Sequence, residues 1–215
     1  MAVKLRGVIF DLDGTLADTL PICISAFRDA VLGAGGRSYT DDEVTALFGP
    51  TEEGMLRHAL AERWEEAMPS YLRLYEQAHD ACTEPFAGID AVLRTLQSRG
   101  VSMAVVTGKG PHSAEISLRR LCLITYFDLV EAGSPDGPIK PAAIRRVLDH
   151  WNIPAAEVAY VGDVPTDMDA AAEVGVVGLG AAWAATSTLR AAPASAAAHT
   201  FTTVDTFARW IADHT

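Results

Sequence analysis

Three short, mainly apolar runs constrain the fold most, because each run ends abruptly in polar residues. They span residues 5–10, 101–106 and 158–161, with shorter apolar segments at 127–130 and 176–179. Helical segments separate them, at residues 86–100, 111–123, 141–150 and 165–174. Continuous apolar strands that alternate with helices are typical of a parallel sheet covered on both faces. The expected fold class is α/β, with a Rossmann-like, doubly wound parallel sheet.

Residues from about 20 to 82 break this alternation. Helical segments follow one another there with no clear strand between them, at residues 20–32, 41–48, 52–67 and 69–81. A run of helices between the first and second strands indicates an insertion into the sheet domain. We therefore expect an inserted α-helical domain at 17–83, and an α/β core made of residues 1–16 and 84–215.

Composition excludes several classes of protein. The net charge of −11 argues against non-specific nucleic-acid binding. No apolar stretch approaches the ~20 residues of a membrane-spanning helix, and the first apolar run is too short for a signal peptide. The three cysteines, Cys23, Cys82 and Cys122, are far apart and suggest a reducing compartment. We expect a cytoplasmic protein with no nucleic-acid or membrane partner.

Polar side chains follow the apolar runs at the points where the strands should end. The candidates are Asp11 and Asp13 after the first run, Thr107 after the second, Asp163 and Asp167 after the third, and Lys140 ahead of the helix that leads into the third. In an open parallel sheet, ligands bind outside the carboxyl ends of the strands. These residues should therefore form one site.

The residue types at this site suit phosphoryl chemistry. Asp11 and Asp13 lie two residues apart on an extended backbone, so their carboxylates project together and repel unless a cation relieves them. A hard divalent metal is the simplest cation, since all the ligands on offer are oxygen. A metal and a lysine can neutralise and hold a phosphoryl group while a carboxylate attacks phosphorus.

Four motifs in this order resemble those of the haloacid dehalogenase-like phosphatases. They are Asp11-Leu12-Asp13-Gly14-Thr15, Thr107, Lys140-Pro141, and Gly162-Asp163-Val164-Pro165-Thr166-Asp167. The helical insertion resembles the small α-helical cap of that family, and the resemblance covers essentially the whole chain. The phosphoglycolate phosphatase-like branch is the nearest in appearance. Any one motif is weak evidence, but four motifs placed at successive strand ends are strong.

The resemblance implies a role for each catalytic and phosphate-binding position. Asp11 would be the nucleophile that takes the phosphoryl group. Asp13 would protonate the leaving oxygen and then deprotonate the water that cleaves the aspartyl-phosphate. Thr107, Gly108 and Lys140 would bind the phosphoryl oxygens, although many relatives have Asn where this chain has Gly108.

The resemblance also implies a Mg²⁺ site. Its ligands would be the Asp11 carboxylate, the backbone carbonyl of Asp13, and Asp163. Asp167 would support the metal directly or through water, or would orient the lysine of the site. Thr15 would help to position the loop.

Neighbouring activities of the family are less favoured. Its dehalogenases carry no acid at the position of Asp13, and its phosphonate-cleaving members use a cap lysine, whereas no lysine lies between Lys4 and Lys109. Its sugar-phosphate mutases commonly have Glu where this chain has Gly162. A phosphosugar mutase and a non-catalytic binding protein stay open as alternatives to a phosphatase.

The substrate is the least constrained prediction. The family implies a small phosphorylated metabolite, such as phosphoglycolate or a sugar phosphate, and a monomer or a homodimer. Residues 17–85 carry thirteen acidic residues against five arginines, which does not obviously invite an anionic leaving group. We expect Lys109 to be solvated rather than directed into the site, and Arg57 to form a surface salt bridge rather than bind a substrate anion.

Overall fold

The computed structural model describes residues 4–190 and 197–215, so residues 1–3 and 191–196 of the expected core lie outside the described residues. The described residues form a six-stranded sheet in the order β3-β2-β1-β4-β5-β6. The strands are β1 (Gly7–Phe10), β2 (Ser102–Val106), β3 (Leu129–Glu131), β4 (Val158–Gly162), β5 (Val177–Ala181) and β6 (His199–Phe201). All neighbouring strands run parallel, which confirms the expected doubly wound fold.

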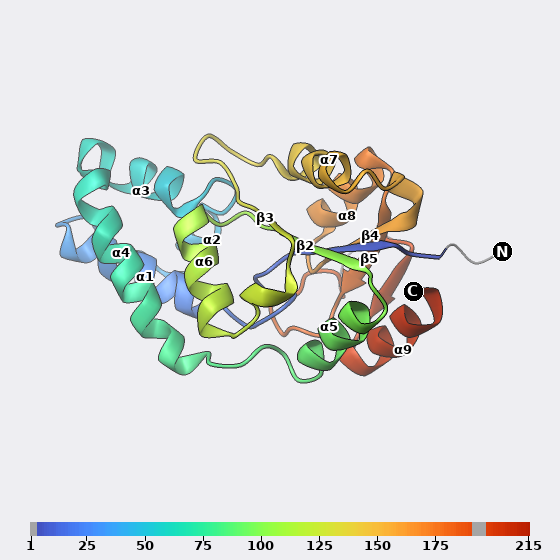
Figure 1. Cartoon of the computed structure of the whole chain (residues 1–215). Coiled ribbons are helices and arrows are strands. Elements are labelled where there is room, and N and C mark those ends of the chain that lie inside the picture. The colour runs from blue at the N-terminus through green and yellow to red at the C-terminus, as the bar shows by residue number, and fades with distance from the viewer. Residues whose placement is uncertain (1–3, 191–196) are drawn as a thin grey trace.

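Helices cover both faces of this sheet (Figure 1). The helices of the core are α5 (Ile89–Ser98), α6 (Pro111–Arg120), α7 (Lys140–Trp151), α8 (Pro165–Val174) and α9 (Val204–His214). Side chains of α5 and α9 share one buried cluster with Val8 and Phe10 of β1. Side chains of α7 and α8 share a second cluster with Ile9, on the opposite face of the same strand. Alternate residues of β1 are thus buried on both sides.

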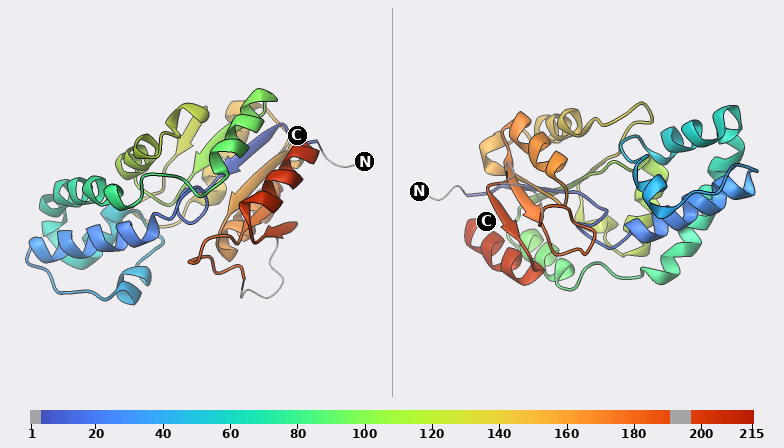
Figure 2. Two further views of the ribbon diagram at one scale, coloured as in Figure 1. Left: turned by 90° about the horizontal axis from the view of Figure 1, so that it is seen from below. Right: turned by 180° about the vertical axis from the view of Figure 1, so that it is seen from behind.

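Four further helices lie together beyond one end of the sheet, and the views agree on this arrangement (Figures 1 and 2). They are α1 (Leu20–Gly33), α2 (Asp41–Thr45), α3 (Glu52–Leu60) and α4 (Trp64–Ala78). Their apolar side chains form a third buried cluster, separate from the two clusters of the sheet. We call these four helices the cap cluster. The domain boundaries at residues 17 and 83 stay a prediction.

The helical boundaries within the cap cluster differ from those expected. Helix α3 ends at Leu60, and the next residue, Ala61, has a left-handed φ of 50°. No helix boundary lies before Pro69, which is inside α4. Helix α4 continues through the proline because Ala67, Tyr71 and Tyr75 recur at four-residue spacing and are all buried. The prediction of a helix boundary at Pro69 was therefore wrong. Helix α2 is also shorter than the expected 41–48.

The carboxyl ends of the strands face the cap cluster. The strand order reverses between β1 and its neighbour β4, with Phe10 beside Val161. Such a reversal opens a crevice outside the strand ends, where ligands bind in folds of this kind. No helix among the residues that the structure describes is long and apolar enough to cross a lipid bilayer.

Candidate active site

Asp11 is the first residue beyond β1 and is only 6% exposed. Its backbone N–H donates to the Val161 carbonyl of β4 (2.8 Å), so the sheet fixes its position. One carboxylate oxygen accepts from the Leu12 N–H (2.8 Å), and the other accepts from Lys140 Nζ (2.7 Å). Burial raises the pKa of Asp11 to about 6, against the lowering effect of Lys140 and with a further contribution from the charge of Asp167.

Lys140 begins α7 and joins two carboxylates. Its Nζ donates to Asp11 and also to Asp167 Oδ1. Burial alone would lower the pKa of Lys140, but the charges of these two partners hold that pKa well above its usual range. Lys140 is therefore an ammonium within the site.

Asp163 follows β4 and has a buried oxygen, Oδ2, with no hydrogen-bond partner among the described residues. Burial raises the pKa of Asp163 to about 8, and the charges of Asp11 and Asp167 raise it further. Asp11, Asp163 and Asp167 each present an oxygen within 4.8 Å of the others. We call these three residues the acidic cluster. An unpartnered buried carboxylate oxygen beside two other carboxylates fits a hard divalent cation.

Asp167 holds its place through the start of α8. Its Oδ2 accepts from the backbone N–H groups of Asp163 (3.1 Å) and Val164 (3.3 Å). A carboxylate at the third position of a helix commonly accepts from the residue that precedes the helix. Asp167 thus contacts Lys140 and lies in the acidic cluster, and its role in supporting a metal or orienting that lysine stays a prediction.

Thr107 and Gly108 follow β2 on the opposite side of Asp11 from β4. The Thr107 N–H donates to the Glu131 carbonyl (3.0 Å), and its Oγ1 accepts from the Lys109 N–H (3.2 Å). A Cβ placed on Gly108 would meet nothing within 4 Å, so this residue faces open space. A hydroxyl and an unobstructed backbone therefore border the site here.

Asp13 lies on the side of the site that faces the cap cluster. Its Oδ1 accepts from Thr19 Oγ1 and from Lys109 Nζ (3.2 Å). Lys109 is only 6% exposed, its Nζ lies 2.8 Å from Cys23 Sγ, and it lies 4.4 Å from the centre of the Tyr75 ring. The prediction of a solvated Lys109 was wrong, because α1 and α4 bring Cys23 and Tyr75 over it.

The loop between Asp11 and α1 is tightly constrained. Gly14 has a φ of 73°, and a Cβ there would lie 2.4 Å from Asp163 Oδ2. The Thr15 carbonyl accepts from Trp183 Nε1 (3.0 Å), while its buried Oγ1 has no partner among the described residues. Only glycine allows this backbone to approach the acidic cluster so closely.

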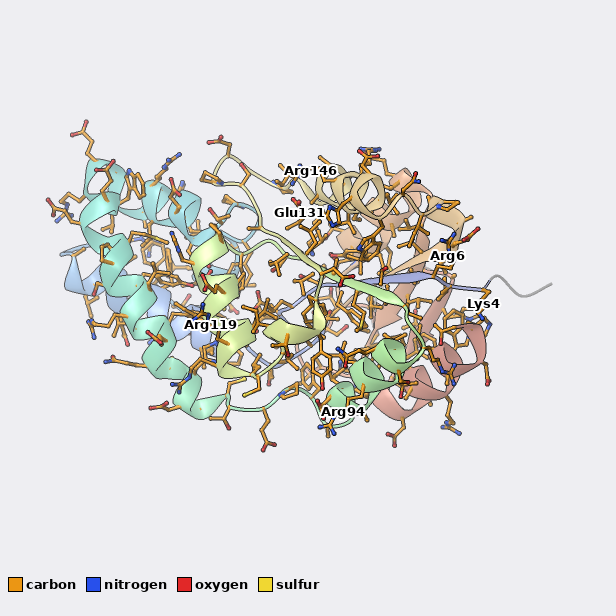
Figure 3. All side chains as sticks on the ribbon, viewed as in Figure 1. Lys4, Arg6, Arg94, Arg119, Glu131 and Arg146 are labelled. Atoms are coloured by element: carbon orange, nitrogen blue, oxygen red, sulfur yellow. The ribbon has the colours of Figure 1, made fainter. Side chains whose placement is uncertain are left out.

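One cavity of about 630 Å³ collects most of the predicted site residues. Its walls include Asp11, Asp13, Thr107, Gly108, Lys140 and Asp163. Thr15 and Asp167 are not among its lining residues, although Asp167 accepts a hydrogen bond from Lys140, which does line the cavity. Lys4, the remaining lysine of the chain, lies at the far end of the molecule from the cap cluster (Figure 3).

Two residues at the site were not predicted. Glu52, the first residue of α3, is 5% exposed and accepts from the Gly110 N–H (2.7 Å) and from Ser113 Oγ. Ser187 Oγ donates to the Asp163 carbonyl (2.7 Å). The signal for Glu52 was its place in an acidic first turn, which usually indicates a solvated helix end. Nothing in the sequence singled out Ser187.

Comparisons with known proteins show which family the chain belongs to. The profile of a family described as haloacid dehalogenase-like hydrolase matches residues 8–181. A phosphoglycolate phosphatase of Neisseria meningitidis is 30% identical over 188 residues, which cover 82% of this chain and 80% of that protein. A proposed pyrophosphatase, PpaX, of Caldanaerobacter subterraneus is 30% identical over 183 residues, covering 84% and 83%.

Solved structures show the same fold. A variant of CbbY from Rhodobacter sphaeroides, in complex with xylulose-(1,5)-bisphosphate, superposes with a TM-score of 0.80. The sequence identity is 18%, and the match covers 93% of this chain and 95% of that chain. The chain therefore belongs to the haloacid dehalogenase-like hydrolases. Within them it is a phosphatase-type member that resembles the phosphoglycolate phosphatases.

Proposed function

We propose that this protein is a Mg²⁺-dependent phosphatase that hydrolyses a small-molecule phosphate monoester through an aspartyl-phosphate on Asp11. One observation carries the proposal, namely the surroundings of the Asp11 carboxylate. It borders a cavity, accepts a hydrogen bond from Lys140, and has an oxygen within 4.8 Å of oxygens of two further buried carboxylates. A nucleophilic carboxylate, a fixed ammonium and a divalent-cation site are the groups that phosphoryl transfer requires. Phosphoglycolate and sugar phosphates are the substrates that the family resemblance suggests.

The residues present fit the proposed metal. Asp11 and Asp163 would hold Mg²⁺ with the backbone carbonyl of Asp13, and Asp167 would support it directly or through water. When bound, Mg²⁺ would neutralise negative charge on the phosphoryl group and in the acidic cluster. The unpartnered Asp163 oxygen is the observation that supports this assignment.

The first half of the reaction falls to residues that follow β1 and β2 and to the first residue of α7. The Thr107 hydroxyl and the Lys140 ammonium bind phosphoryl oxygens and hold phosphorus against Asp11. The Asp11 carboxylate attacks phosphorus, and the bond from phosphorus to the leaving oxygen breaks. Asp13 donates a proton to that leaving oxygen, so the product departs as a neutral alcohol.

The second half returns the enzyme to its starting state. Asp13, now ionised, accepts a proton from water, and that water attacks the phosphorus of the aspartyl-phosphate. Thr19 and Lys109 both contact one Asp13 oxygen, which orients the carboxyl group for these transfers. Asp11 and inorganic phosphate are the products of this step.

The cap cluster completes the site in this proposal. Residues 17–83 would act as a cap domain that excludes water while the phosphoryl group is transferred. Support comes from its separate apolar cluster and from its residues in the cavity wall, such as Phe27 and Met55.

The position before Asp163 favours a phosphatase over a mutase. A Cβ on Gly162 would lie 2.3 Å from Asp167 Oδ2, so the glutamate that family mutases commonly carry there does not fit. A mutase would convert a sugar phosphate into a phosphorylated isomer, whereas a phosphatase releases inorganic phosphate. A binding protein would do neither.

Phosphate release from p-nitrophenyl phosphate tests the proposal, with Mg²⁺ and with a chelator. We expect turnover only with Mg²⁺, and Asp11→Asn should keep below about 1% of it, since an amide does not attack phosphorus. Circular dichroism should show Asp11→Asn folded. Turnover that survives the chelator, or an Asp11→Asn variant above that level, would contradict the mechanism.

A further inference from the structure

The half of the cavity away from the acidic cluster is largely apolar. The cap cluster and the connection between its helices α2 and α3 contribute Leu20, Phe27, Phe48, Met55 and Tyr71 to the cavity wall. The cavity volume of about 630 Å³ lies within the range of sites that enclose ligands much larger than phosphoglycolate. The part of a substrate beyond its phosphoryl group would therefore meet aliphatic and aromatic surface.

Cations in the cavity are already engaged. Among the described residues that line it, the positively charged side chains are Lys109 and Lys140. Lys140 contacts two carboxylates of the acidic cluster, and Lys109 contacts Asp13, Cys23 Sγ and the Tyr75 ring. A second anionic group on the substrate would have no free cation to pair with in this wall.

Arg57, the arginine that could reach a substrate anion, is engaged elsewhere. Its guanidinium pairs with Glu53 and Asp136 and lies 4.7 Å from the centre of the Trp64 ring. Arg57 is absent from the cavity wall, which confirms the surface salt bridge expected from the sequence.

An exposed acidic side chain in the cavity wall also disfavours an anionic leaving group. Asp169 of α8 lines the cavity and is exposed, so it presents negative charge there, whereas Glu173, which also lines the cavity, is paired with Arg145 (2.9 Å). An anionic leaving group would approach the Asp169 carboxylate and then lose its water without gaining a partner. Burying an unpaired charge is among the most unfavourable events in a protein interior.

We infer that the leaving group of the substrate is uncharged and largely apolar, for example an aryl or alkyl alcohol. This inference rests on the proposed phosphatase function and narrows it. It excludes the carboxylate of phosphoglycolate and the second phosphoryl group of pyrophosphate or a bisphosphate as the preferred occupants. The alcohol product would leave the apolar wall for water after the phosphorus–oxygen bond breaks.

Three matched esters test the inference: benzyl phosphate, 4-carboxybenzyl phosphate and 4-(aminomethyl)benzyl phosphate. We expect kcat/KM with Mg²⁺ to be at least about tenfold higher for the uncharged ester than for either charged one. Equal or faster hydrolysis of either charged ester would overturn the inference, as would a preference for phosphoglycolate over benzyl phosphate.

A charge introduced into the cavity wall should change this order. Phe48 lines the cavity and is 38% exposed, so Phe48→Arg places a cation there at a position that tolerates a polar group. We expect Phe48→Arg to raise the ratio of 4-carboxybenzyl to benzyl turnover by about tenfold. Leu32→Arg, at a 59% exposed position outside the cavity wall, is the matched control and should leave the ratio unchanged.

Failure of the inference is distinguishable from failure of the proposed function. If no ester is hydrolysed, the phosphatase proposal fails, and the dissociation constants of benzylphosphonate and 4-carboxybenzylphosphonate still report on the cavity. Tighter binding of the uncharged phosphonate would support an apolar site without turnover. Tighter binding of the carboxylated one would overturn the inference independently of catalysis.

Discussion

Gly14 and Gly162 both lie beside the acidic cluster, where there is no room for a side chain. Gly162 ends β4 with an ordinary negative φ, so its requirement for glycine comes from space rather than from backbone conformation. The Asp167 carboxylate fills the position that a Cβ would take. The same carboxylate accepts from two backbone N–H groups and from Lys140, so any displacement would disturb the whole cluster.

Gly162→Ala should therefore damage both stability and activity. The methyl group must displace the Asp167 carboxylate, and we expect a loss of about 1–3 kcal/mol in the free energy of unfolding, because overpacking a filled site strains its neighbours. Urea unfolding and phosphate release measure the two effects. Gly33→Ala is the control, since a Cβ there meets nothing within 4 Å at the end of α1. That variant should be as stable as the wild type or more so.

Individual site residues could be placed from the sequence where a strand end dictated their position. Asp11, Thr107 and Asp163 each follow a buried strand, and the parallel sheet brings such residues to one edge. Lys109 could not be placed this way. Its burial depends on Cys23 and Tyr75, which come from helices whose packing over the site no local pattern encodes.

One side chain links α3 of the cap cluster to α6 of the core. The Glu52 carboxylate accepts from the Gly110 N–H at the start of α6 and from Ser113 in its first turn. A helix start leaves N–H groups unpaired and favours negative charge, so Glu52 stabilises α6 from a different part of the chain. The Thr51 N–H adds a bond to the Ser134 carbonyl (3.0 Å) beside it.

Glu52→Ala should weaken this link between elements. Removing the buried acceptor leaves the Gly110 N–H unpaired, and we expect a loss of about 1–3 kcal/mol in the free energy of unfolding. The variant should also be cleaved faster by proteases near Thr83, an exposed residue at the expected cap boundary. Glu53→Ala is the neighbouring control. Glu53 pairs with Arg57 at the surface, so its loss should cost less than about 0.5 kcal/mol. Equal effects of the two variants would refute the role of Glu52.

Elements with strong apolar patterns were predictable, and those without them were not. Helix α8 was predicted to the residue, because Pro165 begins it and Gly175 ends it. Strand β6 has three residues, two of them exposed at the sheet edge, so it carries no apolar run. Helix α9 did carry a signal, since its buried residues Val204, Phe207 and Ile211 recur at helical spacing.

The junction between the end of α4 and α6 connects the cap cluster to the core of the molecule. His79 is fully buried there, with Nε2 3.1 Å from Ser117 Oγ and Nδ1 3.1 Å from the Cys82 carbonyl. Burial lowers the pKa of His79 below its usual 6.5, and the positive charges of Lys109 and Arg120 lower it further. The folded state thus binds a proton at His79 less readily than the unfolded chain does.

The contribution of His79 to global stability should accordingly fall in mild acid. A lowered pKa in the folded state means that the stability present above pH 6.5 is lost as the pH falls toward the lower folded-state pKa. As the pH falls from about 7.5 to 5.5, the free energy of unfolding of the wild type should therefore decrease relative to that of His79→Gln. Urea unfolding at each pH measures this. His58→Gln, at an exposed position, should keep the wild-type dependence. An unchanged slope in His79→Gln would contradict the assignment.

Sheet order is a property of the whole chain that the sequence constrained only in part. Alternating strands and helices predicted a parallel sheet, and the observed order places β1 at its centre, between β2 and β4. The apolar pattern of each strand is compatible with several neighbouring strands. The strands that flank β1 are therefore determined by how the crossover helices pack. The insertion after β1 was predictable, since four successive helices interrupt the alternation.

The central place of β1 has a consequence for biosynthesis. This strand is translated first, yet its earliest partner, β2, begins about ninety residues later at Ser102. At the usual speed of a ribosome, roughly 5 to 20 seconds separate the two. The helices α1–α4 are complete in that interval and can associate with one another, while the wholly apolar strand β1 is still without a partner strand. A chaperone that shields β1 during synthesis would thus act on this protein before any of its sheet exists.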